Sequence, residues 1–130
     1  MQDPLRWIDL IDRHRATYTC APSFAYGLVA SRIAEDGKRP WDLRCLRFIL
    51  NGGEAIVARS ARRFLQLLAP CGLPPTAMHP AWGMSETCSA ATFSDDFHLI
   101  TDVNRAVAVG PANPGVELRV VDDADNPVPA

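Results

Sequence analysis

Residues 79–87 read His79-Pro80-Ala81-Trp82-Gly83-Met84-Ser85-Glu86-Thr87. The short run from Met78 to Trp82 predicts a strand, and Gly83 predicts a turn directly after it. An indole can stack on a purine, a serine hydroxyl can donate to a phosphate, and a carboxylate can hold a divalent cation. Trp82, Ser85 and Glu86 therefore predict one side of a nucleotide site, which needs a partner surface for its other side.

Helix-forming and strand-forming segments alternate on the N-terminal side of this stretch. Helices are predicted from Pro4 to about His14 after a cap at Asp3, between a cap at Ser23 and a stop at Gly37, and over residues 57–69. Strands are predicted over residues 17–21, 46–50 and 78–82. Strands that alternate with helices predict a parallel sheet with right-handed crossovers, so the fold class is α/β.

The pattern changes from Ala90 onward, where no helical period is present. Residues 116–121 alternate apolar and polar side chains, which predicts a half-exposed strand, and residues 122–126 predict a turn. We therefore divide the chain into an α/β part, residues 1–89, which carries the nucleotide half-site, and a β-rich segment, residues 90–130. This second segment is expected to be incomplete at its C-terminal end, as in a piece of a larger protein.

Composition and charge exclude several classes of protein. The 130 residues fit one modest domain, and 48% of them are hydrophobic. A formal net charge of −2 argues against a nucleic-acid partner. No apolar run approaches the ~20 residues that cross a bilayer, and the N-terminus lacks the pattern of a signal peptide. We expect a cytoplasmic protein with no nucleic-acid or membrane partner.

The cysteines are spread along the chain, with no CxxC pair and no histidine at ligand spacing. They are Cys20, Cys45, Cys71 and Cys88. Reduced, mostly buried thiols are expected, and neither a zinc site nor a disulfide framework is predicted.

Two loops follow predicted parallel strands, Asn51-Gly52-Gly53-Glu54-Ala55 and residues 82–87. Ligands of open α/β sheets bind at the carboxyl ends of the strands. Paired glycines let a flat ring approach the backbone closely, although a tight strand-to-helix turn explains them equally well. Trp82 as a core aromatic and Glu86 as a solvated charge are likewise open alternatives.

Three common nucleotide or nucleophile motifs are absent from the sequence. It contains neither GxGxxG nor GxxxxGK[ST]. Gly83-Met84-Ser85 is comparable to the GxSxG elbow of hydrolases, but Thr87 stands where the second glycine belongs. A serine hydrolase is therefore not indicated.

Residues 46–55 and 79–87 together resemble the adenylate-forming, AMP-binding superfamily. This group contains acyl-CoA synthetases, fatty acyl-AMP ligases and adenylation domains of nonribosomal peptide synthetases. Residues 17–26 are similar to the strand–proline–helix that precedes the glycine loop in these enzymes, and residues 109–122 resemble their later VGxPxPGxxxRIVD segment. The resemblance covers nearly the whole chain and is greatest to adenylation domains of peptide or hybrid polyketide–peptide synthases.

The resemblance implies a βαβ segment of the large N-terminal subdomain of an adenylation domain, followed by the start of an antiparallel β portion. It also implies roles for matching residues. Those on the nucleotide side are Gly52, Gly53, Glu54, Ala55, Trp82 (the adenine-stacking aromatic, usually Tyr) and Gly83. The catalytic residues are Ser85, matching an α-phosphate contact that is usually Thr, and Glu86, matching the Mg²⁺ ligand, while Asn51 and Met84 belong to the substrate pocket.

The reaction that the resemblance implies is attack of a carboxylate on ATP, giving an acyl-adenylate and pyrophosphate in the presence of Mg²⁺. The acyl group of an amino or other carboxylic acid then passes to the phosphopantetheine thiol of a carrier-protein domain. The Lys-Gly phosphate loop, the ribose-binding aspartate and the mobile subdomain with its lysine have no counterpart in residues 1–130. We therefore expect an internal piece that depends on the remainder of the adenylation domain and is inactive alone.

Two alternatives stay open at the level of sequence. One is part of a stand-alone acyl-CoA or fatty acyl-AMP ligase. The other is a noncatalytic nucleotide-binding or scaffold module that keeps the half-site and works through protein contacts.

Overall fold

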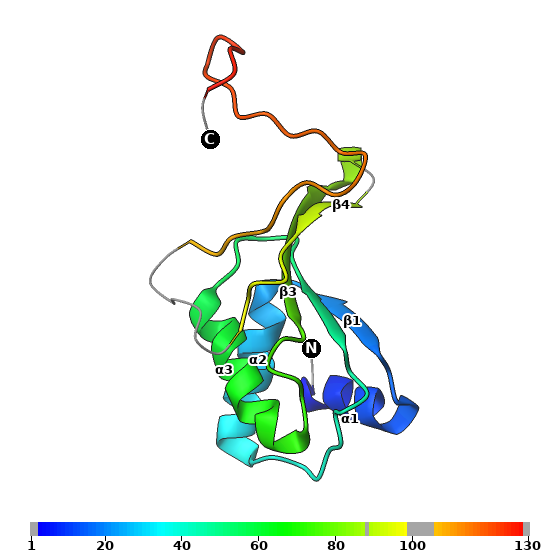
Figure 1. Ribbon diagram of the computed structural model, residues 1–130. Helices are drawn as coiled ribbons and strands as arrows, with labels where there is room; N and C mark the ends of the chain where they lie inside the picture. The colour runs from blue at the N-terminus through cyan, green and yellow to red at the C-terminus, as the bar shows by residue number, and fades with distance from the viewer. Residues whose placement is uncertain (1–2, 88, 99–105, 129–130) are drawn as a thin grey trace.

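A computed structural model of the chain describes residues 3–87, 89–98 and 106–128. Its elements follow in the order α1 (Leu5–His14), β1 (Tyr18–Ala21), α2 (Ser23–Asp36), β2 (Phe48–Asn51), α3 (Ala58–Leu68), η1 (Ala69–Cys71), β3 (Met78–Met84), η2 (Ser85–Thr87) and β4 (Ser89–Phe93) (Figure 1). The helices and strands predicted for the first part of the chain are present, with bounds that agree within about two residues.

The strands form one sheet in the order β1-β2-β3-β4. The pairs β1–β2 and β2–β3 are parallel, whereas β3 and β4 are antiparallel. Helix α2 connects β1 to β2, α3 connects β2 to β3, and the two helices pack against each other on one side of the sheet (Figure 1). The predicted α/β class, a parallel sheet followed by an antiparallel strand, is confirmed.

The core lies between this sheet and the helices. Each of the three helices buries one apolar stripe with a spacing near 3.6 residues. The stripes comprise Leu5, Ile8 and Ile11 on α1, Tyr26, Val29, Ala30 and Ile33 on α2, and Ala61, Phe64, Leu65 and Leu68 on α3.

The predicted cap at Ser23 is wrong. Ser23 is the first residue of α2, and Pro22 occupies the N-cap position without a side-chain hydrogen bond. The Ser23 Oγ instead accepts a hydrogen bond from the backbone N–H of Val57, at 2.9 Å. At α1 the N-cap position is likewise held by a proline, Pro4, one residue after the predicted cap, and the carboxylate of Asp3 accepts a hydrogen bond from the N–H of Leu5, at 3.0 Å.

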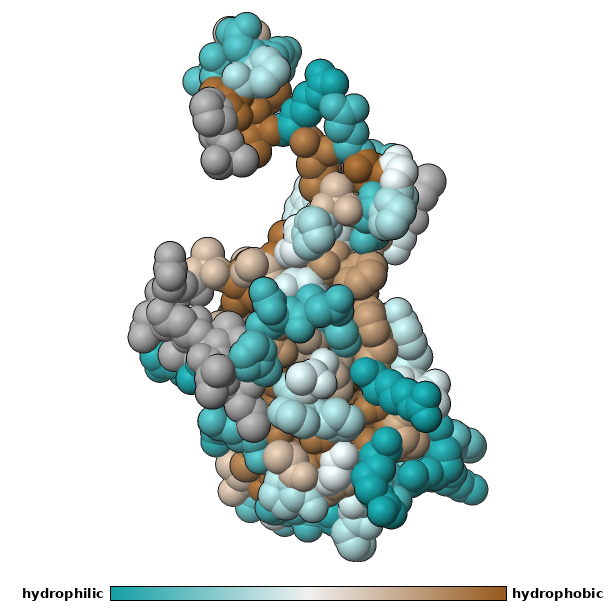
Figure 2. Space-filling view, in the orientation of Figure 1, coloured by the Kyte–Doolittle hydropathy of each residue, from teal (hydrophilic) through white to brown (hydrophobic). Residues whose placement is uncertain are grey.

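The predicted strand over residues 116–121 is also wrong. Val116, Leu118 and Val120 are exposed, and the C-terminal arm (residues 116–128) leads away from the α/β part (Figure 1). A strand needs a neighbouring strand for its backbone hydrogen bonds. Within the described residues, the arm has one isolated bridge, which pairs Val121 with Pro127. The space-filling view shows hydrophobic surface along this part of the chain (Figure 2).

The turn predicted over residues 122–126 is confirmed. The Asp122 carboxylate accepts hydrogen bonds from the N–H groups of Ala124 and Asn126, both at 2.9 Å. These backbone hydrogen bonds hold the pKa of Asp122 below its ordinary value. The turn is therefore specified by its own side chain and does not need a sheet partner.

The described cysteines are free thiols, but their burial is less than expected. Cys20 is exposed, whereas Cys45 and Cys71 are half-buried. Burial raises the pKa of the Cys71 thiol. Cys88 lies outside the described residues. Among the helices of the described segments, none is long and apolar enough to cross a membrane.

Candidate functional site

The first wall of the site is the glycine loop (residues 52–57), which joins the carboxyl end of β2 to α3. Gly53 has φ +85°, a left-handed conformation that favours glycine. A Cβ on Gly52 would lie 2.8 Å from the carbonyl oxygen of Ala81 on β3. The turn and the close approach of β3 therefore account for both glycines.

The second wall is the hairpin tip (residues 82–87), which connects β3 to β4. The register shifts between Trp82 and Gly83, and a Cβ on Gly83 would overlap the carbonyl oxygen of Ser89. Trp82 is 42% exposed, so it is not a core aromatic of this chain. Its indole is available to a flat ligand.

A cavity of about 600 Å³ lies between the two walls. The lining residues are Gly53, Glu54, Ala55 and Ile56 from the glycine loop, Ala81, Trp82 and Gly83 from β3, and Ala106, Val107 and Val109. The fold thus brings together the two loops that the sequence singled out, because β2 and β3 are neighbours and parallel.

A second cavity, of about 380 Å³, extends from the same walls toward β4. It is lined by Leu50, Gly52, Gly53, Ala81, Trp82, Gly83, Met84, Ser85, Ser89 and Ala90. Gly53, Trp82 and Gly83 border both cavities, so a ligand in one would adjoin a ligand in the other.

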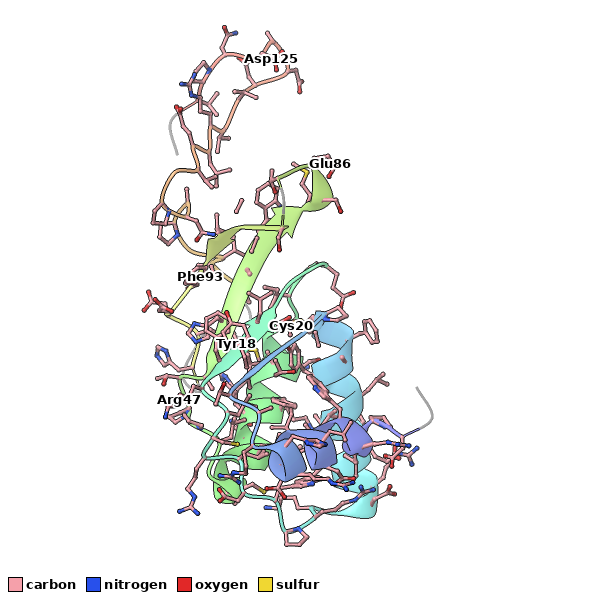
Figure 3. All side chains as sticks on the ribbon, turned by 90° about the vertical axis from the view of Figure 1, so that its right-hand side faces the viewer. Tyr18, Cys20, Arg47, Glu86, Phe93 and Asp125 are labelled. Carbon is pink, nitrogen blue, oxygen red and sulfur yellow. The ribbon has the colours of Figure 1, made fainter. Side chains whose placement is uncertain are left out.

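The hydroxyl and carboxylate of the tip lie in η2. Ser85 borders the smaller cavity, whereas exposed Glu86 borders neither cavity and lies at the far end of the hairpin (Figure 3). The Thr87 Oγ1 accepts a hydrogen bond from the N–H of Met84 at 3.2 Å, and it lies 2.9 Å from the carbonyl oxygen of Met84. Thr87 therefore closes the turn that presents Ser85 and Glu86.

Two other predicted site residues do not offer a free side chain to a ligand as Trp82 does. Glu54 borders the larger cavity, but its Oε1 accepts a hydrogen bond from the N–H of Phe24 on α2, at 2.6 Å. Asn51 is fully buried and borders neither cavity. Its side-chain amide has no hydrogen-bond partner among the described residues.

Tyr26 binds the end of β2 that leads into the glycine loop. Its hydroxyl donates to the carbonyl oxygen of Leu50, at 2.6 Å. Burial raises the pKa of the Tyr26 phenol, with a smaller contribution from Cys20. The hydroxyl therefore stays protonated and remains a donor throughout the physiological pH range.

Sequence reasoning missed several lining residues. Ala90 reaches the smaller cavity because β4 folds back on β3, and β4 was not predicted, whereas Leu50 reaches it from the end of the predicted strand β2. Val107 and Val109 reach the larger cavity from a later segment. Ala81 belongs to residues 79–87, but the sequence predicts it only as part of a strand.

The family model of AMP-binding enzymes matches residues 1–130, and the chain belongs to this family of adenylate-forming enzymes. A similar curated protein is the putative ligase Rv1013 of Mycobacterium tuberculosis, which is 34% identical over 100% of the chain and 28% of its own length. The nonribosomal peptide synthetase btyA of Aspergillus terreus is 39% identical over 91% of the chain and 13% of its own length. The chain therefore spans less than a third of these relatives.

Solved structures of adenylation domains have the same fold. One is the adenylation domain of a keto acid-selecting NRPS module bound to keto acyl adenylate, with 34% identity, TM-score 0.89, and coverage of 98% of this chain and 29% of that one. Another is McyG A-PCP complexed with phenylalanyl-adenylate, with 33% identity, TM-score 0.91, and coverage of 98% of this chain and 20% of that one.

Proposed function

We propose that the chain supplies part of the ATP site of an adenylation domain that activates a carboxylic acid as its acyl-adenylate. The observation that carries this proposal is the cavity of about 600 Å³ between Trp82 and the glycine loop. Two similar structures that are bound to adenylates support it. The alternative is a noncatalytic module, and pyrophosphate exchange distinguishes the two.

Trp82 is the platform for adenine in this proposal. Its indole is partly exposed at the cavity, and the facing wall is the glycine loop, where Gly53 presents no side chain. A purine can thus stack on the indole while its other face meets backbone. Gly83, whose Cβ would overlap the β4 backbone, keeps Trp82 at this position.

Ser85 and Glu86 serve the phosphates. The Ser85 hydroxyl is a donor at the edge of the smaller cavity. Mg²⁺ is commonly held by one or two carboxylates together with substrate phosphates, and the exposed carboxylate of Glu86 fits that pattern. When bound, Mg²⁺ would neutralise charge on the phosphates, which is the main requirement of phosphoryl-centre chemistry.

The reaction forms one bond at the α-phosphorus and breaks another. An oxygen of the substrate carboxylate attacks this phosphorus, and the bond to the β-phosphate oxygen breaks, so that an acyl-adenylate and pyrophosphate result. A carrier-domain phosphopantetheine thiol would then attack the acyl carbon and release AMP. The similar A-PCP structure supports a carrier domain as the partner for this second step.

The smaller cavity is the acyl pocket in this proposal. Its walls are mainly apolar and include the side chains of Met84, Leu50 and Ala90. Buried Asn51 stands in the chain between Leu50 and Gly52, which line this cavity, so it would support the pocket without touching the substrate. Because apolar pockets discriminate by volume, we expect a carboxylic acid with an apolar substituent.

Pyrophosphate exchange tests the proposal on the complete adenylation domain, with a panel of amino, keto and fatty acids. We expect exchange that requires ATP, Mg²⁺ and one class of acid. ATP binding without exchange would favour the noncatalytic module, and transfer to free coenzyme A would favour a stand-alone ligase. The 130-residue chain alone is expected to give no exchange, because other parts of the family's active site lie outside it.

A further inference from the structure

The first turn of α2 contacts the segment around the glycine loop at three successive points. The contacts are hydrogen bonds from the Tyr26 hydroxyl to the Leu50 carbonyl oxygen (2.6 Å), from the Phe24 N–H to Glu54 Oε1 (2.6 Å) and from the Val57 N–H to Ser23 Oγ (2.9 Å). They lie before, within and at the end of the glycine loop. The loop is therefore fastened along its whole length to one helix terminus.

These contacts differ in environment, and the difference shows how firmly the loop is held. Ser23 and Tyr26 are 1% and 0% exposed, so their partners cannot exchange these hydrogen bonds for water without opening the core. Glu54 is exposed, but its carboxylate lies at the positive end of the α2 dipole and accepts from a first-turn N–H group. The loop can move only if α2 moves or if these bonds break.

The bond to Phe24 also changes the interpretation of Glu54. A carboxylate beside ATP would repel the phosphates, whereas a carboxylate at a helix N-terminus is stabilised there. The side chains of Ser23 and Glu54 are directed at backbone groups of the opposite segment. Both residues therefore act on the shape of the loop.

We propose that Glu54 and Ser23 are positioning residues, which brace the glycine loop against α2 and hold the adenine wall of the cavity in its binding conformation. This inference rests on the proposed ATP site. Without the brace, the loop would populate other conformations, and only the fraction in the braced form would bind ATP tightly. The expected consequence is a higher KM for ATP, with a smaller change in kcat.

The variants are made in the complete adenylation domain. Glu54→Ala removes the acceptor, Glu54→Gln retains an oxygen that accepts from the Phe24 N–H, and Ser23→Ala removes the acceptor for Val57. Asp3→Ala is the matched control, because it deletes a carboxylate that accepts from the N–H of Leu5 in the first turn of α1.

Two measurements are made on each variant, amide hydrogen exchange of residues 50–57 and the KM for ATP in pyrophosphate exchange. We expect Glu54→Ala and Ser23→Ala to speed amide exchange in this segment and to raise the KM for ATP by about 5-fold, the equivalent of losing one cap. Glu54→Gln should recover most of the protection and lower the KM again. Asp3→Ala should change neither quantity.

The two readouts separate this inference from the proposed function. Unchanged amide exchange in Glu54→Ala and Ser23→Ala would overturn the brace, whatever the domain catalyses. Faster exchange with an unchanged KM for ATP would overturn its role in positioning the site. A KM that rises equally in Glu54→Gln and Glu54→Ala would assign Glu54 to direct charge contact, against the proposal. If the wild-type domain shows no pyrophosphate exchange, the proposed function fails, and amide exchange still decides whether the brace exists.

Discussion

The two walls of the cavity are supported in different ways. The glycine loop is tied to α2, whose Ser23 and Tyr26 are buried in the core. The hairpin tip projects beyond the helices (Figure 3) and is held by the β3–β4 pairing and by the hydrogen bonds of Thr87, while the backbone N–H and side-chain amide of Asn113 donate to carbonyl oxygens of Ala91 and Ala90 on β4. The glycine loop is therefore anchored to the hydrophobic core, whereas the hairpin tip lies outside that core.

This difference has a consequence for mutational analysis. A change in the glycine loop acts on packing and on binding together, because the same hydrogen bonds serve both. Removing an exposed side chain of the tip alters what the cavity binds and leaves the core untouched. Comparing unfolding free energy with ATP affinity therefore distinguishes the two walls, provided that variants are matched in chemistry.

The largest effect is expected for Gly83→Ala, compared with Gly53→Ala in the other wall. The added Cβ at position 83 would overlap backbone atoms of Ser89 and Ala90, so the hairpin must open, at a local cost of about 3 kcal/mol or more. At Gly53 the added Cβ meets open space and only the positive φ is unfavourable, at about 1 kcal/mol. Amide exchange of residues 82–93 measures the first effect, and equal protection in both variants would contradict the account of the hairpin.

The second largest effect is expected for Glu86→Gln. The amide keeps the shape of the side chain and loses the charge. The Mg²⁺ concentration for half-maximal pyrophosphate exchange should therefore rise at least about 10- to 100-fold, which is the loss of metal affinity when a residue that supports a metal ligand is mutated. The exposed position of Glu86 predicts an unchanged unfolding midpoint. Wild-type Mg²⁺ dependence in this variant would exclude Glu86 as the ligand.

Trp82→Ala should raise the KM for ATP by about 5- to 150-fold, because aromatic–base stacking contributes roughly 1–3 kcal/mol in nucleic-acid systems. Trp82→Tyr is the control, since a phenol retains a stacking face. Thermal unfolding of both variants should match the wild type, because the indole is outside the core. A large fall in Tm for Trp82→Ala would break the contrast between the walls.

Thr87→Val should have the smallest effect. The substitution removes the Oγ1 that accepts from the Met84 N–H while it keeps the β-branched shape. The same hydroxyl also donates to a backbone carbonyl oxygen, at 2.9 Å from Met84 O and 3.1 Å from Ser89 O. Losing these exposed hydrogen bonds costs about 1 kcal/mol or more, so pyrophosphate exchange at low ATP should fall by at least about 5-fold. Thr87→Ser retains the hydroxyl and should behave as the wild type. Equal rates in the two variants would show that the turn does not depend on Thr87.

Most of the α/β part was predictable because its signals are local. Apolar spacing identified the faces of α2 and α3, and the glycine pair identified the loop after β2. The brace was not predictable, because the partners of Ser23 and Glu54 are backbone N–H groups 34 and 30 residues away, which leave no mark in the sequence. Ser23 therefore resembled a helix cap.

In the second part of the chain, one predicted strand does not form and one strand that does form was not predicted. Residues 116–121 alternate as a strand does, yet alternation specifies only which side chains share a face, and the strand forms only beside a partner. β4 was missed because Ser89–Phe93 has no such alternation and is specified by its pairing with β3. The cavity wall that β4 provides was therefore absent from the predicted site.

If the indole of Trp82 forms the adenine platform, as we propose, Trp82 fluorescence responds directly to ATP. The signal is obtained as the difference between the wild-type domain and Trp82→Phe, which removes the contributions of all other tryptophans of the domain, Trp7 and Trp41 included. We expect ATP with Mg²⁺ to quench this difference signal and to protect it from acrylamide, with a midpoint near the KM for ATP. An acrylamide-accessible and unchanged Trp82 signal at saturating ATP would contradict the proposal.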